Sequence, residues 1–317
     1  MSTPLIPQEI YLLERYCQPE PFEKVRDAWA AMVKHAEVML DRFMRQLPPD
    51  YRNRPLPNQP DRVWGERVLR NFRDTLQQLN ESYIELSHGD LNALDGAGGV
   101  ASDLRGQRMD YPEDWMDEVE PGAANRFSDL GLAADLLARP IVRTARQSWD
   151  EGDLTVHYSD RVKAPLNPPA SWPIYRLNPK VRVRSGDRTP KTGIYLPDVD
   201  RGFPALLIEN AVRLRGKAAK ASVPTYVLPD GSQQDVVPTT WTLVERIADS
   251  GGGIPGAVDP IQAGVRMRCE AGQPCPREGF WITPAKTDSR RRFTRGELMP
   301  AVRSDYGYTI WEWDEQQ

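Results

Sequence analysis

The chain has 317 residues, of which 39% are hydrophobic and 27% are charged, so it can bury a sizeable core and does not have the composition of a disordered protein. Its length is typical of two domains. The net charge of -4 argues against a nucleic-acid partner, because nucleic-acid-binding proteins usually carry a basic balance or a basic face, and it suits a basic protein partner.

The sequence predicts a cytoplasmic protein. Residues 1–20 contain no basic segment followed by an apolar run, so we expect no secretory signal peptide. No stretch approaches the ~18 consecutive apolar residues of a membrane helix, and we expect no membrane partner. The three cysteines, Cys17, Cys269 and Cys275, are odd in number and widely spaced, which favours a reducing compartment. A bridge between Cys269 and Cys275 stays open at this point.

Residues 1–152 are predicted to form a helical domain. Apolar residues recur there at helical spacing, and proline-rich or irregular segments separate the periodic stretches. Asp61 is a candidate N-cap, Gly89 a candidate helix end, and Pro140 is expected to kink or break the helix that contains it. These segments predict a small helical bundle. The three predicted helices span residues 22–47, 61–88 and 121–149.

Residues 153–317 are predicted to form a mostly-β domain. Helical periodicity fades near Gly152, short β-prone runs follow, and turn signals separate them. The fold class expected for the whole chain is therefore α+β, with an N-terminal helical bundle and a C-terminal mostly-β domain. The predicted strands span residues 154–158, 181–184, 193–196, 225–228, 240–244, 264–268, 280–283 and 308–313.

An internal repeat lies in the second half, at residues 181–197 and 265–284. Both segments open with Val-Arg-x-Arg, then carry Gly-x3-Pro-x2-Gly followed by an apolar–aromatic pair. Alternation in Val-Arg-x-Arg directs both arginines to one face, and the Pro and Gly residues set a turn. We therefore expect a duplicated strand–turn–strand hairpin in one β domain; two hairpins alike by chance is the alternative. The matched positions are Gly186, Pro190, Gly193 and Tyr195 in the first copy, and Gly272, Pro276, Gly279 and Trp281 in the second.

The C-terminal half resembles two families of bacterial polymorphic toxin systems, immunity protein 71 and immunity protein 72. The resemblance depends on the block from Gly272 to Trp281, on Thr309-Ile310-Trp311-x-Trp313, and on the earlier stretches 185–195 and 239–246. The helical half carries no such motif. The resemblance implies an antitoxin that binds one cognate toxin domain stoichiometrically, in bacterial competition through type VI secretion. We expect it to occlude the toxin's active site; trapping the toxin in an inactive state is the alternative.

Glycines, prolines and aromatic residues shared across a family of diverse toxins are expected to be structural. Trp311 and Trp313 lie two apart on one predicted strand and therefore share a face. We expect them to pack in the core between the two repeats, although stacking on a ligand is the alternative.

The predicted toxin-binding segment is the acidic stretch from Asp110 to Glu120, in the half without a family motif. Like charges at this density repel each other unless a basic surface meets them, and an aromatic residue among them can act as an anchor. The alternative is a solvated loop with its Trp in the core. The candidate residues are Asp110, Glu113, Asp114, Trp115, Asp117, Glu118 and Glu120.

The sequence gives little support for catalysis. His35, His88 and His157 are isolated, no metal-ligand spacing occurs, and no glycine-rich segment has the pattern of a phosphate loop. We therefore predict no catalytic residue, no metal and no cofactor. Two alternatives stay open: a hydrolase that reverses a toxin's modification, and an adaptor protein of a secretion apparatus.

Overall fold

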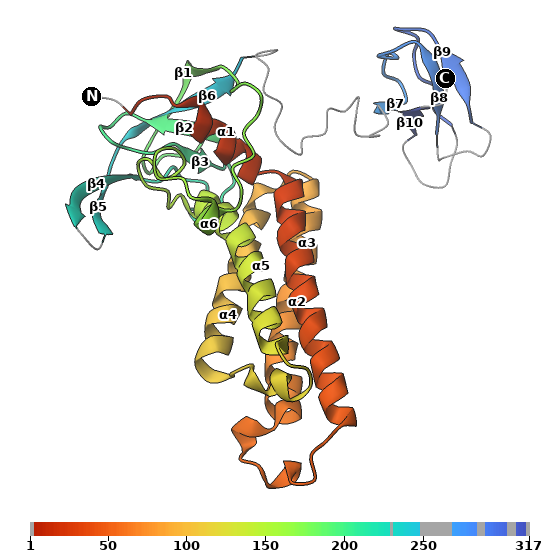
Figure 1. Cartoon of the computed structure of the whole chain (residues 1–317). Helices are drawn as coiled ribbons and strands as arrows, with labels where there is room; N and C mark the ends of the chain where they lie inside the picture. Colours follow the sequence, from red (N-terminus) through yellow and green to blue (C-terminus); the bar gives the residue numbers. More distant parts are fainter. Residues whose placement is uncertain (1–2, 229–230, 248–267, 284–288, 303–308, 315–317) are drawn as a thin grey trace. The chain divides into compact units, whose positions relative to one another are not determined.

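The computed structural model describes residues 3–228, 231–247, 268–283, 289–302 and 309–314. The chain divides into two compact units, Met1–Gly256 and Ala257–Gln317 (Figure 1). Helices and antiparallel sheets make this an α+β protein, as predicted.

The first unit begins with a helical region. Pro7 and Pro19 each occupy the first turn of a helix, where a missing N–H costs no intrahelical bond. The α-helices are α1 (Pro7–Tyr16), α2 (Pro19–Arg45), α3 (Leu69–Ser87), α4 (Gly98–Asp110), α5 (Ala123–Arg146) and α6 (Asp160–Lys163). The 3₁₀-helices are η1 (Tyr51–Asn53), η2 (Leu56–Asn58), η4 (Leu91–Ala97) and η5 (Asp114–Glu118), and the π-helical η3 (Asp61–Val68) runs directly into α3.

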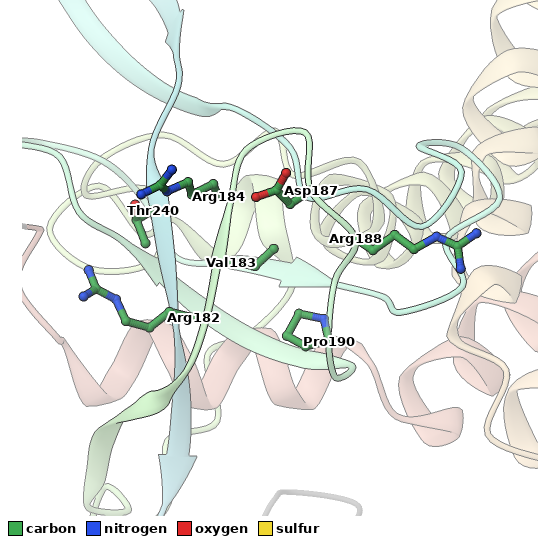
Figure 2. Close-up of a pocket in the computed structure, with 7 residues that line it drawn as sticks. All are labelled: Arg182, Val183, Arg184, Asp187, Arg188, Pro190 and Thr240. Carbon is green, nitrogen blue, oxygen red and sulfur yellow. The ribbon is translucent and has the colours of Figure 1, made fainter.

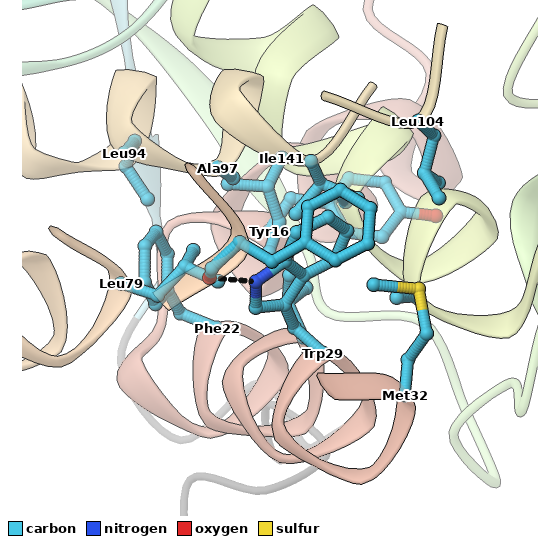
Figure 3. Close-up of a cluster of buried hydrophobic side chains, with 14 of the residues drawn as sticks. Tyr16, Phe22, Trp29, Met32, Leu79, Leu94, Ala97, Leu104 and Ile141 are labelled. Carbon is cyan, nitrogen blue, oxygen red and sulfur yellow. Dashed lines mark hydrogen bonds between the residues drawn. The ribbon is translucent and has the colours of Figure 1, made fainter. Parts of the chain in front are cut away.

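The core of this region lies between α2, α3 and α5. Aromatic rings pack edge to face there: Trp29 against Phe72 at 5.0 Å between ring centroids, and Trp64 against Phe127 at 5.2 Å. The buried Trp29 indole donates a hydrogen bond of 2.9 Å to the Phe72 carbonyl, so its one polar atom is satisfied (Figure 3). Apolar residues at helical spacing on α2, such as Met32, extend the same buried stripe.

The predicted helices are present, with differences at their ends and interior. Pro140 does not break α5, because it removes one backbone bond while its neighbours Ala138 and Ile141 stay buried in the bundle. Gly89 has φ of +91° directly after α3, the conformation expected of a helix end. Asp61 is the first residue of η3 and not its N-cap, which is Pro60; the Asp61 carboxylate accepts the Tyr51 hydroxyl.

A four-stranded antiparallel sheet completes the first unit. Its strands are β1 (Tyr175–Arg184), β2 (Gly193–Pro197), β3 (Ala205–Leu207) and β6 (Thr240–Arg246), in the order β1-β6-β2-β3. The strands β4 (Ala221–Leu228) and β5 (Gly231–Val237) form a separate two-stranded hairpin. The strand predicted at residues 154–158 is instead a series of turns, with Leu154 buried in the helical core.

Both faces of this first sheet are apolar over part of their area. Tyr195, Trp241 and Val183 point to one side and form a small core of their own. On β2, Ile194 and Leu196 flank Tyr195 and point to the other side, where they join the core of the helices. The helices and the first sheet therefore share one continuous core.

The second unit contains a sheet of the same kind. Its strands are β7 (Arg268–Glu270), β8 (Gly279–Ile282), β9 (Arg291–Phe293) and β10 (Ile310–Trp313), in the order β7-β10-β8-β9. Trp281, Phe293 and Trp311 form its core together with Cys275 and Met299. All but the last residue of the strand predicted at 264–268 lies outside the described residues.

The two sheets match residue by residue. Tyr195 is paired with Leu243 in the first sheet, and Trp281 is paired with Trp313 in the second. The other pairings correspond in the same way: Val183 with Trp241 and Cys269 with Trp311, Gly193 with Leu207 and Gly279 with Phe293, and the bridges Arg188 with Lys217 and Pro274 with Leu298. The repeat seen in the sequence is therefore one part of a duplicated four-stranded sheet.

The division between the units differs from the predicted boundary at residues 152 and 153. The first repeat lies in Met1–Gly256 and the second in Ala257–Gln317, so the two hairpins do not belong to one β domain. The physical reason is the second apolar face of the first sheet. Ile194 and Leu196 pack into the helical core and make the sheet part of the helical unit.

Candidate functional site

The acidic stretch predicted to bind a toxin is largely integrated into the helical region. The Trp115 side chain is only 8% exposed and packs edge to face against Phe43 and Trp64, at 5.8 and 5.5 Å between centroids. Its indole nitrogen is buried and has no hydrogen-bond partner in the described structure. A ring in this position supports the fold and does not serve as an accessible anchor, which corrects that part of the prediction.

Most carboxylates of this stretch have partners within the chain. Asp117 accepts the backbone N–H of Ala124 in the first turn of α5, a favourable position for a negative charge. Asp110 and Asp114 are exposed. The remaining pairs are Glu113 with Gln107 and Ser128, Glu118 with Arg54, and Glu120 with Arg42 and Arg126. The charge density that motivated the prediction is thus offset mainly by the protein's own polar groups.

The shared glycines and aromatics have structural roles. Gly186 and Gly272 have φ of +92° and +85°, values that favour glycine, in equivalent turns. The buried Tyr195 hydroxyl donates to the Lys191 carbonyl, and the buried Trp281 indole donates to the Arg277 carbonyl in the same way. The turn prolines Pro190 and Pro276 are exposed in both copies, and a Cβ on Gly193 would approach Leu243 to 2.8 Å.

The C-terminal tryptophans pack inside the second unit. Trp311 lies against Phe293 at 4.9 Å between centroids, and Trp313 lies against Trp281 at 5.4 Å. The Trp311 indole donates to the Pro300 carbonyl. The two rings therefore belong to the core of their own sheet. The prediction that they pack in a core between the two repeats is wrong.

An arginine-rich cavity of about 590 Å³ opens on the first sheet (Figure 2). Arg182 and Arg184 both extend from β1, on either side of the buried Val183, as the alternating pattern predicts. The third arginine, Arg188, lies in the turn that Gly186 makes possible. Asp187, Pro190 and Thr240 complete the lining.

The positive charge of this cavity is only partly balanced. Arg182 approaches Asp198 at 3.7 Å, and both side chains are at least half exposed, so this pair contributes little. Arg184 and Arg188 make no ion pair within the described part of the chain. The cavity therefore presents guanidinium groups that can bind carboxylates or other oxyanions through paired hydrogen bonds.

A second basic segment adjoins the cavity. Residues 211–222 contain four cations and no acidic residue, and none of the four forms an ion pair with a described residue. The β-bridge between Arg188 and Lys217 brings this segment beside the arginine-rich turn. We refer to Arg182, Arg184, Arg188, Arg213, Arg215, Lys217 and Lys220 as the basic surface. Sequence reasoning missed it because the overall charge is negative, although Val-Arg-Val-Arg and Val-Arg-Leu-Arg were visible signals.

No catalytic grouping emerges among the residues that the structure describes. His35 contacts the Ala123 carbonyl at 2.9 Å, and no three potential metal ligands gather at one point in these residues. Cys269 and Cys275 form no disulfide; their thiols donate to the Pro274 and Arg277 carbonyls. None of the described helices is long and apolar enough to span a membrane.

One buried carboxyl group is perturbed. Burial, reinforced by the negative charge of Glu151, raises the pKa of Glu9 to about 7. Glu9 lies on α1 close to Thr155, whose hydroxyl partly offsets the shift by hydrogen bonding to the carboxylate. No group of three potential metal ligands includes Glu9 among the described residues, and the raised pKa couples its ionisation to the stability of the fold.

Comparison with known proteins adds no relative. No family model matches the chain, and no curated protein or solved structure shows significant similarity to it.

Proposed function

We propose that this chain is an immunity protein that binds one cognate toxin domain stoichiometrically, acts by binding and not by catalysis, and meets an acidic region of the toxin with its basic surface. The observation that carries the proposal is the pair Arg184 and Arg188, exposed beside an open cavity and without an ion pair in the described structure. Exposed guanidinium groups without an ion pair in the described structure can pair with carboxylates of a partner.

The residues that resemble immunity proteins support a division between residues that maintain the fold and residues that contact the toxin. Gly186, Tyr195 and Trp281 maintain the turns and cores of the two sheets. Residues that maintain a fold cannot distinguish one toxin from another, so specificity belongs to exposed side chains. The basic surface consists of exposed side chains, and carboxylates are common in the active sites of hydrolytic enzymes. Pairing them with arginines would block that chemistry directly.

The proposal is tested with the C-terminal domain of the protein encoded directly upstream, expressed in a heterologous bacterium. We expect that domain to arrest growth, and we expect coexpression of the chain to restore growth and yield a 1:1 complex in size-exclusion chromatography with light scattering. A harmless upstream product, or a toxic one that still arrests growth beside the chain, would overturn the proposal.

The contribution of the arginines is tested by the double variant Arg184→Glu and Arg188→Glu. Charge reversal at two contact positions should weaken binding by about tenfold or more and slow association most at low salt. The matched control is Arg105→Glu with Arg108→Glu on α4, two exposed arginines without an ion pair in the described structure. The variant Asp110→Asn with Asp114→Asn tests the acidic stretch, and a larger loss from it would favour that segment as the interface.

A further inference from the structure

The two sheets differ by two insertions, both in the first copy. Eight residues, 208–215, separate Leu207 from Gly216, whereas three, 294–296, separate the equivalent Phe293 and Glu297. The β4–β5 hairpin lies in the second insertion: residues 222–238 precede Thr239, whereas only 303–308 precede its equivalent Thr309. The core sheet forms without either addition, as the second copy demonstrates.

Both insertions line the same groove, which has a volume of about 850 Å³. Val212 and Leu214 come from the first insertion and Val236 from the second. The end of α5 and the η4 turn form the remaining wall. Most of the exposed lining is apolar. Two valines contribute to it with well-exposed side chains: Val212 is 78% exposed and Val236 is 63% exposed. Large apolar side chains gathered at an open groove are typical of an interaction site.

The first insertion is held in a defined position. The Asn92 side chain accepts the backbone N–H of Val212, and the Arg213 guanidinium donates to the Arg146 carbonyl at the end of α5. The loop also closes on itself through the Gly216 N–H and the Ala211 carbonyl, 2.8 Å apart. The groove is therefore largely formed before a partner arrives, which lowers the entropy lost on binding.

The charges around the groove identify the chemistry of its occupant. Arg213 and Lys220 line it, Arg215 and Lys217 lie on the same segment, and none of these four has an ion pair within the described ranges. The carboxylate in the lining, Asp95, is paired with Arg146 at 2.8 Å, so the net charge of the groove stays positive. The bridge between Arg188 and Lys217 also makes the segment continuous with the arginine-rich cavity. An occupant that matches this surface carries apolar side chains toward the groove and carboxylates toward its rim.

We propose that the groove between the two insertions binds an acidic amphipathic segment of the toxin, with apolar side chains over Val212 and Val236 and carboxylates at Arg213 and Lys220. This inference rests on the proposed function for the identity of the partner, but the chemistry of the groove can be tested separately. The segment would add a second, apolar contact to the charge pairing at Arg184 and Arg188.

The first experiment uses the full chain and three fluorescent peptides of equal length: a leucine–glutamate amphipathic peptide, its leucine–lysine counterpart, and a glycine–glutamate peptide. We expect saturable binding of the leucine–glutamate peptide, at least about tenfold tighter than that of the other two. The variant Val212→Asp with Val236→Asp should weaken it by about tenfold. Both positions are exposed, so folding should persist, and circular dichroism checks this.

The matched control is Ile84→Asp with Val156→Asp, which places two carboxylates at exposed apolar positions outside the groove. This control should bind the leucine–glutamate peptide within about twofold of the parent. The groove is refuted if the leucine–lysine peptide binds equally well, or if the groove variant and the control behave alike.

A second experiment repeats the two variants with the upstream toxin domain in isothermal titration calorimetry. A photo-crosslinking residue at position 212 should then attach to a toxin segment rich in Asp, Glu and apolar residues, as read by mass spectrometry. Crosslinks only to basic or uncharged segments would overturn the proposed occupant. Failure of the unaltered chain to bind the toxin domain overturns the proposed function, whereas the peptide result decides the groove by itself.

Discussion

The two sheets share strand order and register but differ in what their outer faces contact. In the first sheet, Ile194 and Leu196 are buried in the core of the helices. The equivalent positions in the second sheet are Phe280 and Ile282, both only partly buried, and Arg290 lies over the Phe280 ring. One backbone arrangement thus supports a sheet that packs on both faces, against its own small core and against the helices, and a sheet with a small core on one face.

The surface charges differ in a similar way. Three arginines on or beside β9 of the second sheet are ion-paired: Arg290 with Asp314, Arg291 with Glu297 and Arg292 with Glu278. In the first copy, Arg184, Arg188 and the cations of residues 211–222 make no ion pair in the described structure. The comparison teaches that the residues that maintain the fold were retained in both copies, whereas the surface that can meet a partner diverged.

The largest predicted effect comes from a charge placed on equivalent outer-face positions. Leu196→Asp buries a carboxylate in the helical core and should destabilise the first unit by at least about 4 kcal/mol, whereas Ile282→Asp should cost about 1 kcal/mol because its side chain reaches solvent. Urea denaturation followed by circular dichroism measures both. Equal losses of unfolding free energy would show that the two outer faces are buried to the same extent.

The next effect concerns the equivalent central rings. Tyr195→Ala and Trp281→Ala each remove a fully buried ring and should each cost about 3–5 kcal/mol. Amide exchange read by mass spectrometry should show the loss at residues 193–197 for the first variant and at residues 279–282 for the second. The milder control Tyr195→Phe removes only the hydrogen bond to Lys191 and should cost about 1 kcal/mol.

A smaller effect, confined to the first unit, depends on pH. Burial raises the pKa of Glu9 to about 7, so its ionisation opposes folding: stability is greatest below the unfolded pKa near 4.5 and falls as pH rises toward 7. Glu9→Gln removes this contribution. Between pH 4.5 and pH 8 its stability relative to the parent should therefore increase, by up to about 3 kcal/mol. A difference that stays constant across this range in urea titrations would contradict the assignment.

The smallest predicted effect falls equally on both copies. Gly186 and Gly272 have positive φ, and a Cβ at either position meets no atom within 4 Å, so conformation and not space favours glycine. Alanine at each should cost about 1 kcal/mol. Thermal unfolding should show the two losses to be similar, and a clearly unequal pair would indicate that the turns are not equivalent.

The repeat was predictable from sequence because its turns need particular residues. Positive φ favours glycine in each turn, and a buried aromatic residue, Tyr195 or Trp281, follows that glycine at the same spacing. Gly186 and Gly272 therefore predicted two equivalent hairpins. The three-residue strands β3 and β9 were not predicted, since a run so short has no measurable alternation. The groove was not predictable either, because the insertions become visible only when the register of both sheets is known.

The candidate site was harder to predict for a physical reason. The partners that neutralise the acidic stretch, such as Arg42 for Glu120 and Arg54 for Glu118, lie more than 60 residues away in the sequence. Long-range pairing of this kind cannot be deduced from local charge density. That Arg184 and Arg188 make no ion pair with a described residue is likewise a property of the fold, although the shared face of Arg182 and Arg184 followed from alternation on β1.

The central claim is that partner binding belongs to the first copy, and hydrogen–deuterium exchange tests it most directly. The full chain is compared alone and in complex with the upstream toxin domain. We predict protection within residues 182–190 and 208–222, with exchange unchanged at residues 114–120 and 268–299. Protection at residues 114–120 or in the second sheet, with none at residues 182–190 and 208–222, would contradict the claim.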